Sequence, residues 1–157
     1  MDISIADLRL DYNLEELLES ETSADPFIVF KQWLERAVSS GRLEPNAMTL
    51  ATISPEGKPR ARMVLLKDFD PRGFVLFTNY QSAKGQELIA NPNAALVFWW
   101  GELQRQIRIE GTVEKISEEE SDNYFFVRPW ESRLGAWASN QSEVISGRDI
   151  LEKRLAE

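Results

Sequence analysis

The sequence predicts an antiparallel, barrel-like α+β domain, and three observations support this fold class. Several short apolar segments, separated by turn-forming residues, follow one another between residues 47 and 115. Helical patterns occur at the margins and once within this block, so the regular strand–helix alternation of parallel sheets is missing. The 157 residues show no internal repeat and suit one domain that is long enough to bury a core.

Composition excludes several classes of protein. Cysteine and histidine are both absent, so this chain alone cannot form a disulfide, a Cys/His zinc site, a thiol nucleophile or a Ser-His-Asp triad. The longest apolar run, Ala94 to Trp100, has seven residues and is too short to span a membrane. The acidic N-terminus is unlike a signal peptide. We therefore expect a cytoplasmic protein that does not bind membranes.

The charge is unevenly distributed along the chain. Residues 1–30 carry a net charge of −7, residues 31–115 carry +3, and residues 116–157 carry −4. A cationic middle within an acidic protein suits a small phosphorylated or carboxylated ligand. It does not suit nucleic acid, whose binding proteins present a dominant basic face. The alternative is that +3 is an ordinary fluctuation over a segment of this length.

The N-terminal region divides into an arm and a helix. Residues 1–22 are predicted to be a mobile acidic arm with at most a short helix, and residues 23–157 to form the domain. Asp25 is a good N-cap, Pro26 fits the first helical position, and Gly41 is well placed to end the helix. We expect this helix to cover a sheet edge or a barrel mouth. Its apolar residues recur at helical spacing: Phe27, Phe30, Leu34, Ala37 and Val38.

Five strands are predicted between the helices. The segment Ser54 to Gly57 has the composition of a hairpin turn, and Asp68 to Gly73 is rich in turn residues. The fourth strand is apolar on both faces, so it should be central or barrel-forming. Gly111 suggests a bend or bulge in the fifth strand. The strands are Ala47 to Ile53, Arg60 to Lys67, Gly73 to Thr78, Ala94 to Trp100 and Arg105 to Lys115.

Three further helices are predicted. A loop from residue 79 leads into a short helix with Ser82 as its N-cap. The sequence from Ser117 to Glu120 is a capping box that opens a helix running to about Val127, where Arg128 and Pro129 end it. A last helix is expected near residues 148–155.

Candidate phosphate-binding residues cluster around the second and third strands. The sequence has neither of the common glycine-rich phosphate loops, so side chains and one helix end would have to bind a phosphate. Arginine and lysine supply charge-assisted bonds, and Ser82 stands at a helix start that favours anions. The alternative is that the strand-end cations are merely solvated and Ser82 is only a cap. The candidates are Arg62, Lys67, Thr78, Ser82 and Lys84.

Glutamine residues suggest a second kind of contact. Gln104 and Gln106 flank Arg105 where the fifth strand begins. Glutamine in a strand most often faces water at an edge, but it can also hydrogen-bond a flat heteroaromatic ring. Gln141 and Ser142 lie in a segment too irregular to be simple core.

Five segments in fixed order carry a family resemblance. They are RARMVLLK, FTNYQSAKGQEL, NPNAALVFWW, RQIRIEG and YFFVRPWESRLGAWASNQS. Together they resemble the pyridoxamine 5′-phosphate oxidase family of FMN flavoproteins, from about Ile5 to the last residue. The resemblance implies a split β-barrel homodimer with FMN in clefts at the subunit interface. It also implies oxidation of pyridoxine or pyridoxamine 5′-phosphate to pyridoxal 5′-phosphate, with O₂ reduced to hydrogen peroxide.

The resemblance also implies roles for individual residues. Arg62 would lie toward the FMN phosphate, Lys84 would bind that phosphate, and the N-terminal arm would close over the substrate. No residue is assigned a catalytic role, because the cofactor carries the chemistry. The candidate FMN contacts, including Ser82 from the argument above, are Arg62, Met63, Val64, Leu65, Leu66, Lys67, Phe77, Thr78, Ser82, Lys84, Gln106, Gln141 and Ser142. The candidate substrate contacts are Arg9, Tyr12, Lys67, Tyr124, Arg128 and Ser132.

The sequence departs from the family pattern in three places. Ala83 stands where the family usually has arginine, and Phe126-Val127 replaces a usual His-Ser. The family also continues beyond the end of this chain with further FMN and substrate contacts, so we expect a truncated version of a complete enzyme. The alternatives are a shortened relative with impaired turnover, an FMN-binding carrier or sensor, and a purely structural dimerising domain. The joint presence of Tyr124, Arg128 and Ser132 favours the oxidase.

Overall fold

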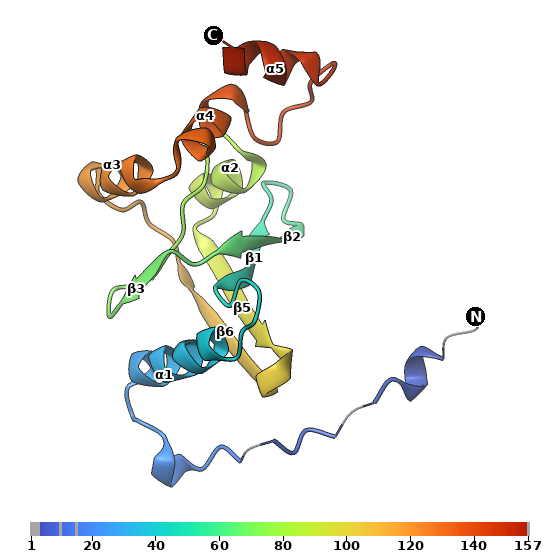
Figure 1. Ribbon diagram of the computed structural model, residues 1–157, viewed down its shortest axis with the longest axis vertical. Helices are drawn as coiled ribbons and strands as arrows, with labels where there is room; N and C mark the ends of the chain where they lie inside the picture. Colours follow the sequence, from blue (N-terminus) through green and yellow to red (C-terminus); the bar gives the residue numbers. More distant parts are fainter. Residues whose placement is uncertain (1–3, 10, 15, 157) are drawn as a thin grey trace.

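A four-stranded antiparallel sheet organises the computed structural model, which describes residues 4–9, 11–14 and 16–156 (Figure 1). The strand order is β2-β1-β5-β6, so the doubly apolar fourth predicted strand is central, as expected. A separate hairpin pairs β3 with β4. The strands are β1 (Ala47–Ile53), β2 (Pro59–Leu65), β3 (Asp68–Asp70), β4 (Gly73–Val75), β5 (Asn93–Trp100) and β6 (Arg105–Thr112).

Three expectations about the strands were wrong. The segment from Asp68 to Gly73 is more than a turn, because its two ends pair as β3 and β4. The third predicted strand accordingly ends at Val75 rather than Thr78. Gly111 produces no bulge, since β6 keeps an uninterrupted register with β5 from Arg105 to Thr112. A glycine is simply tolerated there, with open space beside it.

Helix α1 (Pro26–Ser39) forms as predicted and closes the core. The Asp25 side chain accepts a hydrogen bond from the Phe27 N–H at 2.8 Å, and Gly41 follows the helix with a φ of +75° that favours glycine. Phe30 is 3% exposed and lies between the sheet and the β3–β4 hairpin. Its ring contacts four others edge-on or tilted: Phe69, Phe74, Phe98 and Trp100.

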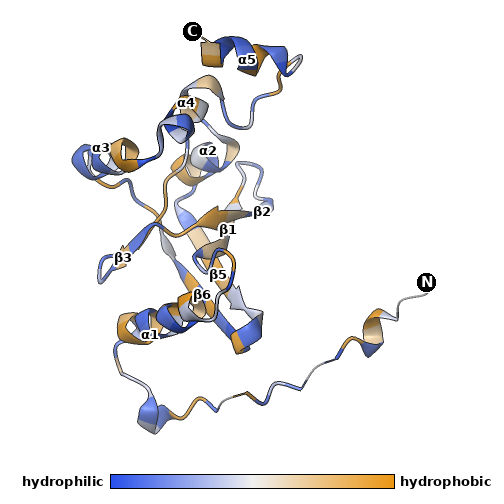
Figure 2. Cartoon of the chain, viewed as in Figure 1, coloured by the Kyte–Doolittle hydropathy of each residue, from blue (hydrophilic) through white to orange (hydrophobic). Residues whose placement is uncertain are grey.

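Helices α2 (Ala83–Ala90), α3 (Glu118–Val127) and α4 (Trp130–Ala138) gather at the end of the sheet away from α1 (Figure 1). The predicted capping box of α3 is present, with the Ser117 and Glu120 side chains each bonded to the other's backbone. Helix α3 is hydrophilic in its first half and hydrophobic in its second (Figure 2). Helix α4 was not predicted, because its sequence lacks a clear apolar period. Helix α5 (Asp149–Ala156) packs against α4.

The two faces of the sheet differ. One face carries Leu50, Phe98 and Trp100 into the core, whereas on the opposite, outer face the side chains of Met63 and Trp99 are 63% and 47% exposed. Side chains alternate between the faces, so neighbours along β2 point to different sides. This alternation decides which of the predicted site residues can meet.

The described part of the N-terminal arm extends away from the sheet and contains short 3-10 turns at Ile5–Asp7 and Glu19–Glu21 (Figure 1). It contacts Gln104, the residue just before β6, whose side chain accepts a hydrogen bond from the Leu14 N–H at 3.2 Å. Gln104 also donates to the Asp11 carbonyl at 3.3 Å. Within the described residues, no helix has the length and apolar character that crossing a membrane requires.

Candidate functional site

Four of the predicted FMN contacts meet at the start of α2. The Lys84 ammonium donates hydrogen bonds to Thr78 Oγ1 at 3.0 Å, to Ser82 Oγ at 3.4 Å and to Gln141 Oε1 at 2.7 Å. Gln141 comes from the loop after α4, 57 residues away in the sequence. We call Thr78, Ser82, Lys84 and Gln141 the Lys84 cluster.

Local sequence explains how the loop and helix present this cluster. Ser82 is fully buried, and its hydroxyl accepts from the Gly85 N–H at 3.3 Å while donating to the Asn79 carbonyl at 2.6 Å. Gly85 is required because a Cβ at this position would lie 2.5 Å from the Tyr80 carbonyl oxygen. The loop before α2 is therefore folded tightly against the helix start, where first-turn N–H groups lack helical acceptors.

The electrostatics of the cluster favour an anion. Burial lowers the pKa of Lys84, the positive charge of Arg62 lowers it further, and Glu87 partly offsets both effects. The three hydrogen bonds of the ammonium group all go to neutral oxygens. A phosphate monoester fits this donor set. Its negative charge would pair with the Lys84 ammonium, and its oxygens would accept hydrogen bonds from the hydroxyls and from the N–H groups at the helix N-terminus.

Arg62 lies nearby but is bonded to the protein. Its Nη2 contacts Glu87 Oε2 at 2.8 Å, and its Nη1 donates to Thr52 Oγ1 and to the Leu50 carbonyl. Burial raises the pKa of Glu87, but hydrogen bonds from Thr52 and Arg62 and the nearby arginine charges outweigh it, so the pKa lies below its usual value. Sequence reasoning missed Glu87; the only signal was an acid one helical turn after Lys84.

The remaining candidate FMN contacts are not brought together in one chain. The side chains of Val64 and Leu66 pack in or against the core, whereas Met63 is 63% exposed on the outer face. Leu65, the last residue of β2, is half-buried. Lys67 has an exposed side chain beyond β2, and Ser142, at a φ of +74°, is exposed beside Gln141.

Gln106 lies on the opposite side of the sheet from the Lys84 cluster. It is exposed on β6 and pairs with Trp99 of β5 across the outer face. Arg62 pairs with the buried Leu50 and therefore points to the core face. One chain cannot place Gln106 beside this cluster.

Three of the candidate substrate residues, Tyr124, Arg128 and Ser132, lie around the α3–α4 junction. The Tyr124 ring stacks on Phe77, with centroids 3.6 Å apart and planes 10° apart. Ser132 is exposed in the first turn of α4. Arg128 is the extended C-cap of α3, so the helix ends at Val127 as predicted, and Arg128 does not continue the helical face that carries Tyr124. The guanidinium of Arg128 instead lies over the Phe125 ring at 5.9 Å.

The N-terminal candidates are placed elsewhere. Tyr12 contacts Trp99 edge-on, with ring centroids 6.4 Å apart. Arg9 is exposed, and its backbone N–H bonds to Asp7. In Figure 1 the arm lies on the side of the molecule away from α3 and α4. Within one described chain, Arg9 and Tyr12 do not approach Tyr124.

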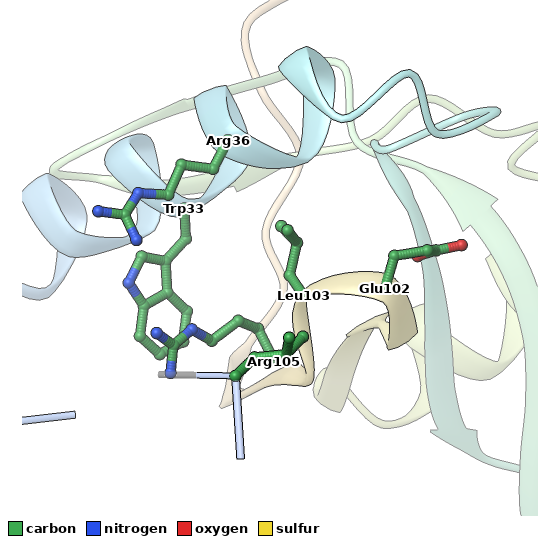
Figure 3. A pocket seen from close by; sticks show the side chains of 6 residues that line it. Trp33, Arg36, Glu102, Leu103 and Arg105 are labelled. Carbon is green, nitrogen blue, oxygen red and sulfur yellow. The ribbon is translucent and has the colours of Figure 1, made fainter. Parts of the chain in front are cut away.

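A separate cavity of about 260 Å³ lies between α1 and the start of β6. Arg105 stacks over the Trp33 ring at 4.8 Å, and Arg36 projects from the same helix as Trp33 (Figure 3). Leu103, Glu102 and Leu14 complete its lining. Sequence reasoning missed this cavity, although Trp33 and Arg36 stand three apart on one helix. It is remote from the Lys84 cluster, which lies at the other end of the sheet (Figure 1).

Comparison with solved structures defines the class. The structure of PhzG from Burkholderia lata 383 in complex with tetrahydrophenazine-1-carboxylic acid matches with a TM-score of 0.85 and 29% identity, over 90% of this chain and 71% of that chain. A pyridoxamine 5′-phosphate oxidase-related, FMN binding protein from Nostoc punctiforme matches with a TM-score of 0.63 and 18% identity, over 83% of this chain and 73% of that chain. The fold is therefore that of the FMN-binding split-barrel proteins.

Sequence comparison then identifies the family. The family model described as pyridoxamine 5′-phosphate oxidase matches residues 34–157. A pyridoxine/pyridoxamine 5′-phosphate oxidase from Microcystis aeruginosa is 99% identical over the whole chain, which covers 73% of that relative. A protein of the same name from Nostoc punctiforme is 65% identical over the whole chain, again 73% of its length. The chain belongs to the pyridoxamine 5′-phosphate oxidase family, whose members use FMN.

Proposed function

We propose that this chain carries the FMN-phosphate and substrate-phosphate sites of a pyridoxine/pyridoxamine 5′-phosphate oxidase. The observation that carries this assignment is the convergence of Thr78, Ser82 and Gln141 on the Lys84 ammonium. The near-identical Microcystis relative bears the name of this enzyme. The substrates are then a phosphorylated pyridine vitamer and O₂.

The chain's own residues supply binding and orientation. The Lys84 cluster would hold the phosphate of FMN, while Tyr124, Arg128 and Ser132 would hold the phosphate of the substrate. When bound, FMN would supply the redox chemistry that oxidises the vitamer and reduces O₂ to hydrogen peroxide. Fixing the substrate phosphate converts binding energy into orientation of the reacting carbon.

The stack of Tyr124 on Phe77 supports placing the two phosphate sites side by side. Phe77 precedes Thr78 of the Lys84 cluster, and Tyr124 lies on α3. Tyr124 thus belongs to the proposed substrate site and touches the proposed FMN site. A carrier or sensor would need the Lys84 cluster but would not need a second phosphate site, made by Tyr124, Arg128 and Ser132, beside it.

A homodimer would complete the site. Met63 and Trp99 lie on the outer face of the sheet and remain 63% and 47% exposed, although the Tyr12 ring contacts Trp99. Large exposed apolar side chains on one face are typical of an interface. Gln106 lies on that same outer face. In a dimer, Gln106 of one copy would contact the cofactor that is held by the Lys84 cluster of the other copy.

Cofactor titration followed by turnover tests the proposal. Apoprotein should bind FMN more tightly than riboflavin and FAD, because the cluster provides for one terminal phosphate. The FMN-loaded protein should release hydrogen peroxide when given pyridoxine 5′-phosphate in air. FMN binding without peroxide release would support the carrier or sensor instead. No preference for FMN over riboflavin would contradict the phosphate assignment.

A further inference from the structure

Glu87 is a buried carboxylate that lies below the proposed phosphate site without belonging to it. The residue is 6% exposed and projects from α2 toward the sheet. Its Oε2 atom accepts a hydrogen bond from Thr52 Oγ1 of β1 at 2.5 Å and from Arg62 Nη2 of β2 at 2.8 Å. One oxygen therefore joins the helix to two adjacent strands.

The three residues form a closed unit. Arg62 Nη1 donates to Thr52 Oγ1 as well, so each of Glu87, Thr52 and Arg62 bonds both of the others. A buried carboxylate is tolerated only when it is paired and hydrogen-bonded, and removal of one partner leaves the remaining charge buried without compensation. The unit therefore resists rearrangement in the folded protein.

Helix α2 has few other anchors. It is eight residues long, and its buried positions are Gly85, which has no side chain, and Glu87. Leu88 adds a partly buried apolar contact with the core. Lys84 stands three residues before Glu87, one helical turn away on the same side. The placement of the Lys84 ammonium thus depends on where Glu87 fixes the helix.

We propose that Glu87 is a positioning residue of the phosphate site: bonded to Thr52 and Arg62, it holds α2 against the sheet so that Lys84 meets the phosphate. The inference rests on the proposed function, in that the phosphate is that of FMN. Two other roles make different predictions. A pure counter-charge would weaken anion binding, and a purely structural residue would affect only folding stability.

The test compares FMN with riboflavin, which lacks the phosphate. Apoprotein variants are titrated with each ligand by flavin fluorescence, and their melting temperatures are measured without ligand. Glu87→Ala should lower FMN affinity about tenfold and leave riboflavin affinity unchanged. Glu87→Gln keeps an oxygen that can accept from Thr52 and Arg62, so FMN affinity should return at least to the wild-type value.

Two further variants keep the test decisive. Thr52→Val preserves the shape of the side chain and removes the hydroxyl, so it should also lower the ratio of FMN to riboflavin affinity even if Glu87→Ala fails to fold. Glu152→Gln is the matched control, because Glu152 is an exposed carboxylate on α5 that pairs with Arg148. It should leave both affinities unchanged.

Three results would overturn an assignment. A lower melting temperature in Glu87→Ala and Thr52→Val with an unchanged affinity ratio would make the unit purely structural. Tighter FMN binding in both Glu87→Ala and Glu87→Gln would make Glu87 a counter-charge. If wild-type protein itself binds FMN no better than riboflavin, the proposed phosphate site is wrong, whatever the Glu87 variants do.

Discussion

The ring of Tyr124 lies parallel to that of Phe77, with centroids 3.6 Å apart, and joins α3 to the segment after β4. The stack restrains one face of the Tyr124 ring, and the residue is half-buried. Its phenol is thus held in place at the border of the two proposed phosphate sites.

Removing the Tyr124 hydroxyl and removing the whole ring should have separable effects. Tyr124→Phe keeps the stack, so we expect a several-fold higher KM for pyridoxine 5′-phosphate with unchanged melting temperature and FMN content. Tyr124→Ala should also lower the melting temperature. Steady-state kinetics with flavin absorbance measures both. An unchanged KM in Tyr124→Phe would remove the hydroxyl from the substrate site.

Lys84→Ala should weaken FMN binding by about ten- to a hundredfold, because a charge-assisted contact contributes roughly 1.5–3 kcal/mol. Riboflavin binding should change little. Lys58→Ala, which removes an exposed lysine near the β1–β2 turn, is the control. Fluorescence titration of apoprotein provides the measurement, and equal FMN affinity in Lys84→Ala and wild type would place the phosphate elsewhere.

FMN affinity should fall as the pH rises through the alkaline range. Burial and Arg62 lower the pKa of Lys84 in the free protein, and a bound phosphate would raise it. Binding therefore takes up a proton above the free-protein pKa, so affinity is complete below that pKa and declines above it. Lys84→Arg should abolish the decline, since arginine stays protonated. An identical pH profile in both proteins would exclude Lys84 as the group responsible.

Arg128→Ala should raise the KM for pyridoxine 5′-phosphate and leave FMN content unchanged. Arg128 follows the last turn of α3 in an extended conformation and lies near Phe125, apart from the Lys84 cluster. Arg148→Ala, at the exposed residue just before α5, should have no kinetic effect. If Arg128→Ala only lowers the melting temperature, the side chain stabilises the helix end and does not bind substrate.

Met63→Glu should convert the proposed dimer into monomers. Met63 is 63% exposed on the outer sheet face, so the change should cost the single chain little stability but place a charge in the proposed interface. Leu43→Glu, at an 88% exposed position before β1, is the matched control. Sedimentation at micromolar concentration decides: a monomeric wild-type protein that retains FMN would contradict the dimer.

The sequence alone determined the local elements of this protein. The Asp25 cap, the Ser82 cap and the capping box at Ser117 were all predicted and are all confirmed. Each depends on hydrogen bonds between residues two or three positions apart, so the necessary information lies within one short segment. The five family-like segments likewise identified the family, and Lys84, Thr78, Ser82 and Gln141 were candidates before their contacts were known.

The tertiary structure decided which candidates meet. Arg62 pairs with Glu87 across 25 residues, and β3 pairs with β4 because Phe69 and Phe74 pack on Phe30. Such pairings depend on burial and charge compensation between distant segments. Only the folded chain brings those segments close enough for either effect to operate.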